Sequence, residues 1–564
     1  MEKKNIGIIG VSVVLLVAVV ATIAVVTHHG GSSSTPAAEP QLSSSVKSIK
    51  EFCKATDYQQ TCQSELESAA GNATTPTDLA KLIFNVTSNR IKSALNQSVV
   101  LAELAKDKRT SGALENCREL LEYAVDDLQT SFQQLGGFQM TNFKKAVDDL
   151  KTWLTAALTY QDTCLDGFEN TTTNAGDSMR KALNSSIELT ANILAIVDEF
   201  SSTVQNLEIP LFSRRLLSDG DMPSWMSAGR RRLLQASPSD LKPNVTVAKD
   251  GSGDYKTIND ALAAAPEKSK DIFVIYIKEG VYAEYVTVNR SKPNIAMIGD
   301  GATKTKITGN RNFMQNITTK DTATFAAIGD GFFARDIGIE NTAGPENHQA
   351  VALRVQSDQS VFYHCRFDGY QDTLYAHALR QFFRECTITG TIDFIFGNAQ
   401  VVIQNSQIIV RKPMDNQQNI VTAQGRKEKR AASAIIIQNC TVSADPAYYP
   451  VRNKIPTYLG RPWKEYSRTI YLQNQLDDLI NPQGWLPWLG DYGLKTCFYA
   501  ELDNHGPGAD MSKRAKWRGV KSISYDHAQQ FTVEHFIQGQ LWLPHTGVPF
   551  IPGLLPLSES GRIH

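Results

Sequence analysis

Two aspartates, Asp372 in the run QDTLY and Asp393 in the run DFIFG, lie 21 residues apart in this 564-residue chain. If the chain folds into repeated turns of this length, the two aspartates occupy equivalent positions in neighbouring turns, and their carboxyl groups are direct neighbours. Two carboxylates about 5 Å apart repel by roughly 3 kcal/mol at an effective dielectric near 20, so one should stay protonated after the other ionises. Such a pair supplies an acid and a reactive anion. The alternative is that each aspartate only closes a turn.

Two glutamines border this pair and strengthen the catalytic interpretation. Gln349 in HQAVALR and Gln371 in GYQDTLY are 22 residues apart, and Gln371 directly precedes Asp372. Side-chain amides that converge on one point can stabilise a developing oxyanion. A stacked glutamine alone is more often a structural ladder, but beside two carboxylates the pattern favours chemistry on a carbonyl group.

A repeat of roughly twenty residues must position these side chains. Aligning the runs FARDIGI, FYHCRF, FFRECTI, IQNSQI and IQNCTV places one residue of each in a common column: Asp336, Cys365, Cys386, Ser406 and Cys440. This pattern predicts a parallel β-solenoid, in which equivalent positions stack about 4.8 Å apart. On the same register we expect Cys365 and Cys386 to form a disulfide, the alternative being a stack of free thiols.

Five motifs in this part of the chain resemble the plant pectin methylesterases: GVYAE, QAVALR, QDTLY, DFIFG and LGRPW, within roughly residues 240–560. The resemblance implies an all-β domain, a right-handed parallel β-helix. It also implies that Asp393 is the nucleophile, that Asp372 is the proton donor and acceptor, and that Gln371 and Gln349 stabilise the intermediate.

Three further residues match family positions that contact substrate or organise the site. The resemblance implies that Arg461 keeps Asp393 anionic, which suits the two-pronged geometry of a guanidinium. Trp463 could stack on a sugar ring, its alternative role being packing beneath a loop. Thr319 lies in the polar run NITTKDT and matches a substrate contact.

The implied reaction is hydrolysis of the methyl esters of cell-wall pectin, a homogalacturonan, to pectate and methanol through an aspartyl acyl-enzyme. No metal or cofactor is expected, because the ten histidines show no HExxH or similar spacing. A retaining glycoside hydrolase acting on pectin is one alternative, since it also places two carboxyls about 5 to 5.5 Å apart. A pectin-binding solenoid without catalysis is another.

The N-terminal half is predicted to be a separate helical domain. Residues 45–206 show apolar residues at helical spacing, and the runs CKATDYQQTC and LTYQDTCLDGF resemble the invertase and pectin methylesterase inhibitor family. The resemblance implies an all-α four-helix bundle with disulfides Cys53–Cys62 and Cys117–Cys164. Gln59 stands where many relatives carry proline, which we expect to change the local hairpin and not the fold.

Flanking segments indicate delivery to the cell exterior. Residues 1–27 contain a 21-residue apolar run after two lysines and are predicted to be a signal anchor or a signal peptide, followed by a Ser/Pro-rich linker at 28–44. Eight cysteines and nine N-glycosylation sequons, including Asn72, Asn85, Asn244 and Asn439, favour the secretory pathway and the cell wall.

The linker at 207–235 contains the basic runs SRRLLSDG and GRRRLLQ. We expect a protease to cut there, which releases the catalytic domain at 236–564 from an inhibitor-like domain that restrains it. Separate inhibitor proteins are candidate further partners. The formal net charge of −1 and the absence of nucleic-acid-binding motifs indicate that nucleic acid is not a partner.

Overall fold

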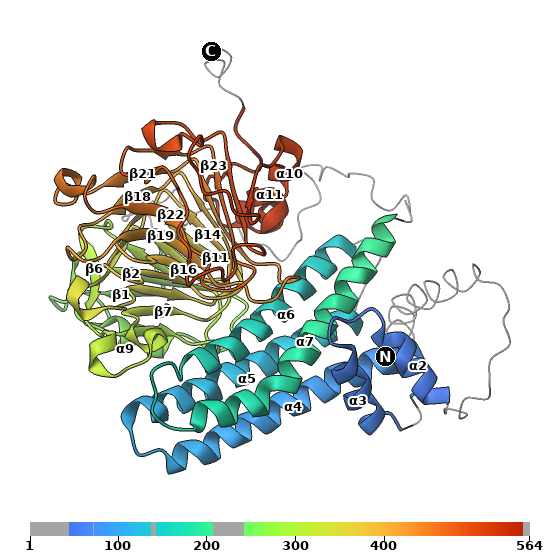
Figure 1. Ribbon diagram of the computed structural model, residues 1–564. Helices are drawn as coiled ribbons and strands as arrows, with labels where there is room; N and C mark the ends of the chain where they lie inside the picture. The colour runs from blue at the N-terminus through green and yellow to red at the C-terminus, as the bar shows by residue number, and fades with distance from the viewer. Residues whose placement is uncertain (1–43, 72, 137–142, 207–241, 557–564) are drawn as a thin grey trace, which may run out of the picture. The chain divides into compact units, whose positions relative to one another are not determined.

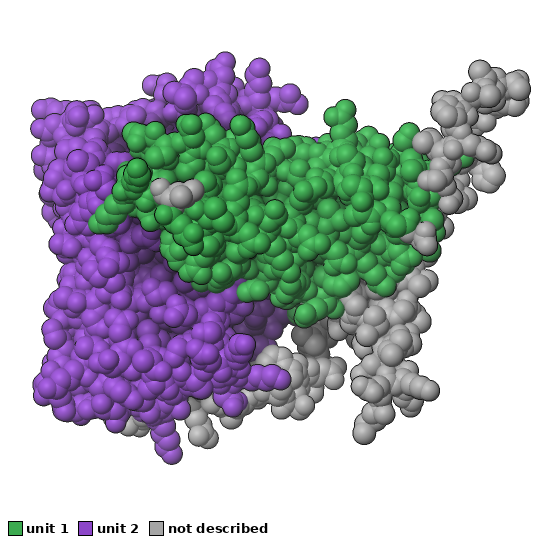
Figure 2. All heavy atoms as spheres, turned by 90° about the horizontal axis from the view of Figure 1, so that it is seen from below, with its two compact units in different colours: residues 1–221, 430–432 green, residues 222–429, 433–564 purple. Residues whose placement is uncertain are grey.

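The computed structural model describes residues 44–71, 73–136, 143–206 and 242–556. The chain divides into two compact units, residues 1–221 with 430–432 and residues 222–429 with 433–564 (Figures 1 and 2). The predicted membrane segment and both RRLL runs lie outside the described residues. Within the described residues, no helix combines the length and the apolar character needed to cross a bilayer.

The N-terminal unit is helical. Its described helices are α2 (Ser44–Cys53), α3 (Gln59–Ala69), α4 (Pro76–Leu104), α5 (Lys108–Gly136), α6 (Phe143–Asp166) and α7 (Ala175–Asn206). Each of the four long helices α4 to α7 packs against two of the others, which makes the predicted bundle. Helix α4 begins at Thr75, whose hydroxyl accepts a hydrogen bond from the Asp78 backbone N–H at 3.2 Å.

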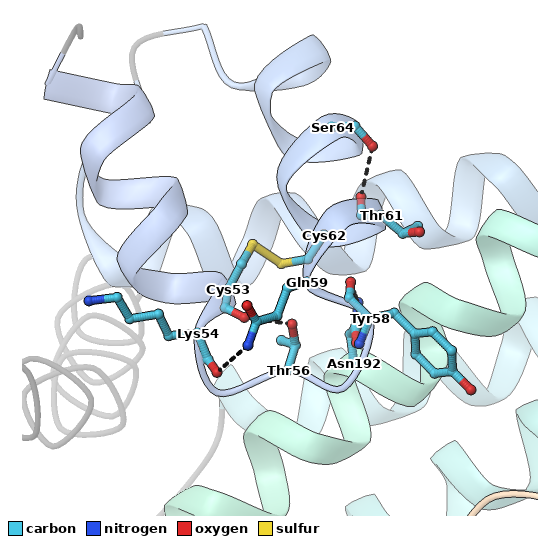
Figure 3. Close-up of a disulfide and its surroundings, with 9 residues drawn as sticks. All are labelled: Cys53, Lys54, Thr56, Tyr58, Gln59, Thr61, Cys62, Ser64 and Asn192. Carbon is cyan, nitrogen blue, oxygen red and sulfur yellow. Dashed lines mark hydrogen bonds between the residues drawn. A yellow bond between two sulfur atoms is a disulfide. The ribbon is translucent and has the colours of Figure 1, made fainter. Parts of the chain in front are cut away.

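Two disulfides join elements of this unit, as predicted. Cys53 at the end of α2 pairs with Cys62 in α3, and Cys117 in α5 pairs with Cys164 in α6. The loop inside the first disulfide is also tied to α7. The buried Asn192 side chain accepts a hydrogen bond from the Tyr58 N–H at 2.8 Å and donates one to the Tyr58 carbonyl at 2.9 Å (Figure 3).

Gln59 is the first residue of α3, a position that proline readily occupies because the N–H there needs no partner within the helix. Here the Gln59 side chain turns back and donates a hydrogen bond to the Lys54 carbonyl at 3.1 Å (Figure 3). Gln59 thus links the helix start to the preceding loop by a side-chain bond that proline could not make.

The C-terminal unit is a solenoid of three parallel sheets; seven complete turns contribute one strand to each sheet, and the turns at the two ends contribute fewer. The eleven-stranded sheet contains β1 (Val245–Val247), β2 (Phe273–Ile277), β5 (Ile295–Gly299), β8 (Phe333–Arg335), β11 (Ser360–Tyr363), β14 (Arg380–Arg384), β17 (Gln400–Gln404), β20 (Ala434–Gln438), β23 (Arg468–Leu472), β25 (Phe498–Leu502) and β26 (Val520–Lys521). The eight-stranded sheet contains β3 (Gly280–Tyr282), β6 (Thr305–Gly309), β9 (Gly338–Asn341), β12 (Arg366–Asp368), β15 (Thr387–Gly390), β18 (Gln407–Val410), β21 (Thr441–Ala444) and β24 (Gln475–Leu476). The seven-stranded sheet contains β4 (Val286–Val288), β7 (Phe325–Ala327), β10 (Leu353–Val355), β13 (Leu374–Ala376), β16 (Ile395–Gly397), β19 (Asn419–Gln424) and β22 (Thr457–Gly460).

This arrangement confirms the predicted parallel β-helix (Figure 1). Its interior is filled by apolar side chains that stack from turn to turn. Leu353, Leu374 and Ile395 are neighbours in register, and the Phe362 ring stacks on that of Phe383 with centroids 4.7 Å apart. Because every turn buries similar side chains, the interior holds successive turns at a fixed spacing.

The register differs from the predicted column at one end. Tyr363 pairs with Arg335 and Arg366 pairs with Gly338, so Asp336 is equivalent to His364 and not to Cys365. Asp336 and His364 share the left-handed backbone conformation, with φ of 58° and 51°. The prediction slipped by one residue here, because the turn from Asp336 to His364 has 28 residues whereas the next two turns have 21 and 20.

The predicted disulfide between Cys365 and Cys386 is wrong, since both residues are buried free thiols. The Cys365 thiol donates to the Tyr363 carbonyl at 3.4 Å, and the Cys386 thiol donates to the Phe362 carbonyl at 3.4 Å. Burial raises the pKa of Cys386 well above its ordinary value, and the adjacent Cys365 raises it further. The alternative of stacked thiols is therefore the one found.

Candidate active site

Asp372 and Asp393 occupy equivalent positions in adjacent turns of the solenoid. Strand β13 pairs with β16 so that Leu374 lies beside Ile395, and each aspartate is two residues before its member of that pair. The Asp372 N–H donates to the Ile392 carbonyl at 3.0 Å, which extends the pairing up to the two aspartates. The adjacency predicted from the 21-residue spacing is what this register produces.

Both aspartates are buried and have left-handed backbones. Their exposed fractions are 7% and 5%, and their φ angles are 65° for Asp372 and 50° for Asp393. Aspartate is among the few residues other than glycine that visit this conformation routinely. Left-handed residues that carry ionisable groups are typical of functional sites, where the surrounding fold maintains the strain.

Arg461 binds Asp393 with both prongs of its guanidinium. Nε donates to Oδ1 at 2.8 Å and Nη2 donates to Oδ2 at 2.5 Å. Burial raises the pKa of Asp393 above its ordinary value, and the guanidinium opposes that rise. Arg461 also lies over the ring of Trp488, 4.3 Å from its centroid. The predicted Arg461–Asp393 contact is thus present, and Trp488 is a site residue that the sequence reasoning missed.

The two glutamines lie beside the aspartates, one position out of register with each other. Strand β10 pairs with β13 so that Leu353 lies beside Leu374, and the same offset makes Gln371 level with Ala350 and not with Gln349. Both glutamines are half-buried. Across the part of the chain that the structure describes, neither side-chain amide has a hydrogen-bond partner. Their NH₂ groups are therefore available to a ligand.

An aromatic floor extends from the aspartates along the seven-stranded sheet. The rings of Tyr375 and Phe396 stack with centroids 4.3 Å apart, and Trp463 meets Phe396 edge-on at 5.9 Å. A Cβ added to Gly425 would lie 2.8 Å from the Trp463 ring, so the ring's position depends on glycine there. Trp463 is half-buried and packed as its alternative role predicted, while stacking on a sugar stays a prediction.

Thr319 begins the short helix η4 (Thr319–Thr322), which contacts the turn that carries Gln349. The Thr322 hydroxyl donates to the Thr319 carbonyl at 2.7 Å and accepts from the Val351 N–H at 3.0 Å. Thr319 is half-buried next to this link. The structure thus places Thr319 near the glutamine that borders the aspartates, and its contact with substrate stays a prediction.

Two histidines near these motifs, His377 and His364, are bonded to other side chains of the solenoid. His377 is fully buried, its Nδ1 lies 3.0 Å from Gln356 Oε1, and burial lowers its pKa well below the ordinary value. His364 lies on a solenoid turn, 2.7 Å from the Glu385 carboxylate. His377 is therefore enclosed within the solenoid, and His364 is bonded to a carboxylate on its surface.

This geometry can therefore support attack on a carbonyl carbon. An anchored carboxylate and a neighbouring carboxyl group lie in adjacent turns of the solenoid, and Gln371 and Gln349 add half-buried amides from the residue before Asp372 and from the preceding turn. Carboxylate attack, proton transfer and oxyanion stabilisation are the three functions that acyl transfer requires.

Comparisons with known proteins agree with this description. The family model described as pectinesterase matches residues 244–540, and the model described as plant invertase/pectin methylesterase inhibitor matches residues 47–196. The Arabidopsis thaliana protein named probable pectinesterase/pectinesterase inhibitor 21 is 49% identical over 98% of this chain and 83% of its own length. Pectinesterase 3 of Phaseolus vulgaris is 44% identical over 93% of this chain and 90% of its own.

A solved structure resembles the C-terminal unit. Pectin methylesterase from carrot is 52% identical to this chain, and the match covers 56% of this chain and 100% of the carrot chain with a TM-score of 0.56. The matched share of this chain corresponds to the C-terminal unit without the helical unit.

Proposed function

This chain belongs to the pectinesterase family, and on that premise we propose that it hydrolyses the methyl esters of cell-wall pectin through a covalent intermediate on Asp393. The observation that carries the mechanism is the two-pronged bond from Arg461, which orients the Asp393 carboxylate and favours its ionised form. The clamped carboxylate is the anion, and so the nucleophile.

In the first half of the reaction, an Asp393 oxygen attacks the ester carbonyl carbon of a galacturonate unit. The carbonyl oxygen becomes an oxyanion, which accepts hydrogen bonds from the Gln349 and Gln371 amides. When the intermediate collapses, the bond to methoxide breaks and Asp372 gives its proton to the departing oxygen. Methanol leaves, and the galacturonyl group stays attached to Asp393 as an anhydride.

In the second half, water attacks the same carbonyl carbon and Asp372, now an anion, takes a proton from it. The bond to Asp393 breaks, which releases a galacturonic acid unit and restores both carboxyl groups to their starting states. One residue serves as acid and then as base, as microscopic reversibility requires of a symmetrical covalent cycle.

Methanol release by Asp393→Asn tests this assignment. We expect release at background on highly methylated pectin, because the amide is a poor nucleophile and breaks the charge pairing with Arg461. Asp415→Asn is the matched control, since the Asp415 side chain is 90% exposed on a loop. Clear turnover by Asp393→Asn would remove Asp393 from the nucleophile role.

A retaining glycoside hydrolase is the second candidate, because it also uses two nearby carboxyl groups. The unpaired glutamine amides favour the esterase, since they suit a tetrahedral oxyanion better than a cationic sugar. Incubation with pectin should yield methanol without new reducing ends. New reducing ends in proportion to turnover would support the glycosidase.

In this proposal, the helical unit restrains the activity of the catalytic unit. It matches an inhibitor family, and it precedes the catalytic unit across a segment with two RRLL runs. We expect cleavage near residue 235 after entry into the secretory pathway and delivery of the enzyme to the cell wall. Residues 6–26 either hold the precursor at a membrane or are removed as a signal peptide. N-terminal sequencing of wall-extracted protein should find a start at 235 or 236.

A further inference from the structure

Arg411 links three consecutive turns of the solenoid, two of which contain the aspartate pair. It directly follows strand β18, and its N–H donates to the Gly390 carbonyl of the preceding turn at 2.8 Å. Its side chain reaches one turn further back, where Nη1 donates to the Gly369 carbonyl at 2.9 Å. Gly369 and Gly390 are equivalent positions, because Asp368 lies beside Thr389 in the strand register. One side chain thus spans a complete turn.

The two glycines that Arg411 contacts stand at the same place relative to the aspartates. Gly369 is three residues before Asp372, and Gly390 is three residues before Asp393. In both turns the main chain passes there from the eight-stranded sheet to the seven-stranded sheet. Arg411 is therefore bonded to both of the corners that lead into the aspartate pair.

Arg411 also holds the side chain of Tyr370, the residue directly before Gln371. Its Nη2 donates to the Tyr370 hydroxyl at 2.8 Å, and its guanidinium carbon lies 3.8 Å from the centroid of the Tyr370 ring. A guanidinium that stacks on an aromatic face and bonds the same side chain restricts the motion of both groups. Residues 369–372, here called the Gln371 corner, are thus held by one arginine at two successive positions.

The other bonds of the Gln371 corner come from the backbone ladder. The Tyr370 carbonyl accepts from the Thr391 N–H at 3.0 Å, and the Asp372 N–H donates to the Ile392 carbonyl at 3.0 Å. Bonds of this kind join adjacent turns along any parallel sheet. They do not depend on Arg411, so replacing Arg411 should preserve the fold and loosen the corner alone.

Gln371 is the residue of this corner whose direction matters most for the proposed chemistry. A side-chain amide stabilises an oxyanion only when it is aimed at the position that the oxyanion will occupy. A misplacement of about 1 Å in an active site can cost about 10²-fold in rate. In the described part of the chain, Arg411 makes no hydrogen bond to either aspartate or either glutamine. Any influence of Arg411 on the reaction therefore passes through the corner.

We propose that Arg411 is a positioning residue, which holds Gly369 and Tyr370 and thereby aims the Gln371 amide at the ester carbonyl that Asp393 attacks. This inference rests on the proposed function and adds to it a residue from outside the site. The oxyanion exists only after attack has begun, so the contribution of Arg411 belongs to kcat and not to substrate binding.

Steady-state methanol release by the secreted protein tests this role. Arg411→Met should lower kcat about tenfold or more while KM stays within about twofold of the wild-type value. Arg411→Lys keeps a cation that can donate to one of the two acceptors, and it should recover part of the lost kcat. A rise in KM at constant kcat in Arg411→Met would overturn the proposal, because it would indicate a role in substrate binding. An unchanged kcat would overturn it as well.

Arg452→Met is the matched control. Arg452 follows the short helix η6 (Tyr449–Val451), and its guanidinium carbon also lies 3.8 Å from a tyrosine centroid, that of Tyr449. It also donates to a backbone carbonyl, that of Tyr449, at 2.9 Å. The contacts are of the same kind, but they hold a loop between β21 and β22 and not an aspartate corner. Arg452→Met should leave kcat and KM unchanged.

A double-mutant cycle separates positioning from a general structural role. In Gln371→Leu protein there is no amide to aim, so adding Arg411→Met should change kcat by less than about twofold. A further loss of about tenfold in that background would show independent effects and would overturn the proposal. If Arg411→Met does not fold, as judged by its melting temperature, the same cycle with Arg411→Lys decides, and additive losses there count against positioning.

Hydrogen exchange separates this proposal from the proposed function. In Arg411→Met, the peptide that contains residues 369–374 should exchange faster than in wild type, and the peptide that contains β20 should exchange at the same rate. Unchanged exchange in the first peptide would overturn the proposal. A wild type that releases no methanol, together with faster exchange of residues 369–374 in Arg411→Met, would refute the esterase proposal while confirming that Arg411 holds the Gln371 corner.

Discussion

Arg461 holds Asp393 from two turns further along the solenoid. The residues are 68 positions apart, and the stacking of β16, β19 and β22 brings the guanidinium onto the carboxylate through bonds of 2.8 and 2.5 Å. The clamp opposes the rise in pKa that burial imposes on Asp393. The ionisation of the proposed nucleophile therefore depends on a distant part of the chain.

Replacing Arg461 should move the acidic limb of the pH–rate profile. Asp393 must be anionic to attack, so activity falls as pH drops through its pKa. Arg461→Met removes the charge that opposes burial, which raises the Asp393 pKa further and moves the acidic limb of kcat/KM to higher pH. Arg461→Lys keeps the charge without the two-pronged geometry and should shift the limb less. An unmoved limb, or one at lower pH, in Arg461→Met would contradict this account.

Removing the Gln371 amide should slow the chemical step. Gln371→Leu loses one oxyanion donor, for which a loss of about 10²–10³ in kcat is typical, with little change in KM. Gln407→Leu is the control, because Gln407 is exposed on β18 of another sheet. Methanol release under saturating pectin measures the effect. If KM rises while kcat stays constant, the amide binds substrate and does not stabilise the transition state.

The buried cysteines should react as four free thiols once the protein is unfolded. Cys365, Cys386, Cys440 and Cys497 are all unpaired and buried. We expect no thiol labelling in the native enzyme and four labels per chain in denaturant without reductant. Peptide mapping should locate the labels at these positions. If Cys365 and Cys386 are not labelled in denaturant without reductant, these two residues form a disulfide in the protein and the prediction of four free thiols is wrong.

The Asn192 clamp should stabilise the helical unit. Asn192→Leu removes the hydrogen bond from the Tyr58 N–H and one of the two that the Tyr58 carbonyl accepts, the other coming from the Cys62 N–H at 3.0 Å. We expect a cost of about 1 to 3 kcal/mol in the free energy of unfolding. Asn184→Leu, at an exposed position of the same helix, should change the stability by less than about 0.5 kcal/mol. Urea unfolding followed by helical circular dichroism compares them. Equal midpoints for the two variants would show that the clamp contributes little.

Much of the site was predictable because its spacing matches the solenoid turn. Asp372 and Asp393 are one turn apart in a region without insertions, so sequence distance translated directly into a spatial neighbour. The turn that starts at Asp336 is longer, and there the same reasoning slipped by one residue. Turns of 20 or 21 residues thus gave their register directly from sequence distance.

Composition and spacing by themselves determined the two units, their fold classes and the acidic pair, because helical and solenoid periodicities are local and repeat along the chain. The disulfides of the helical unit were predicted from the family resemblance of its cysteine motifs. Tertiary structure alone decided which buried groups have partners. It paired Arg461 with Asp393 and left Cys365 and Cys386 as thiols. Those outcomes depend on side-chain direction and on contacts between distant turns, which no local pattern in a sequence records.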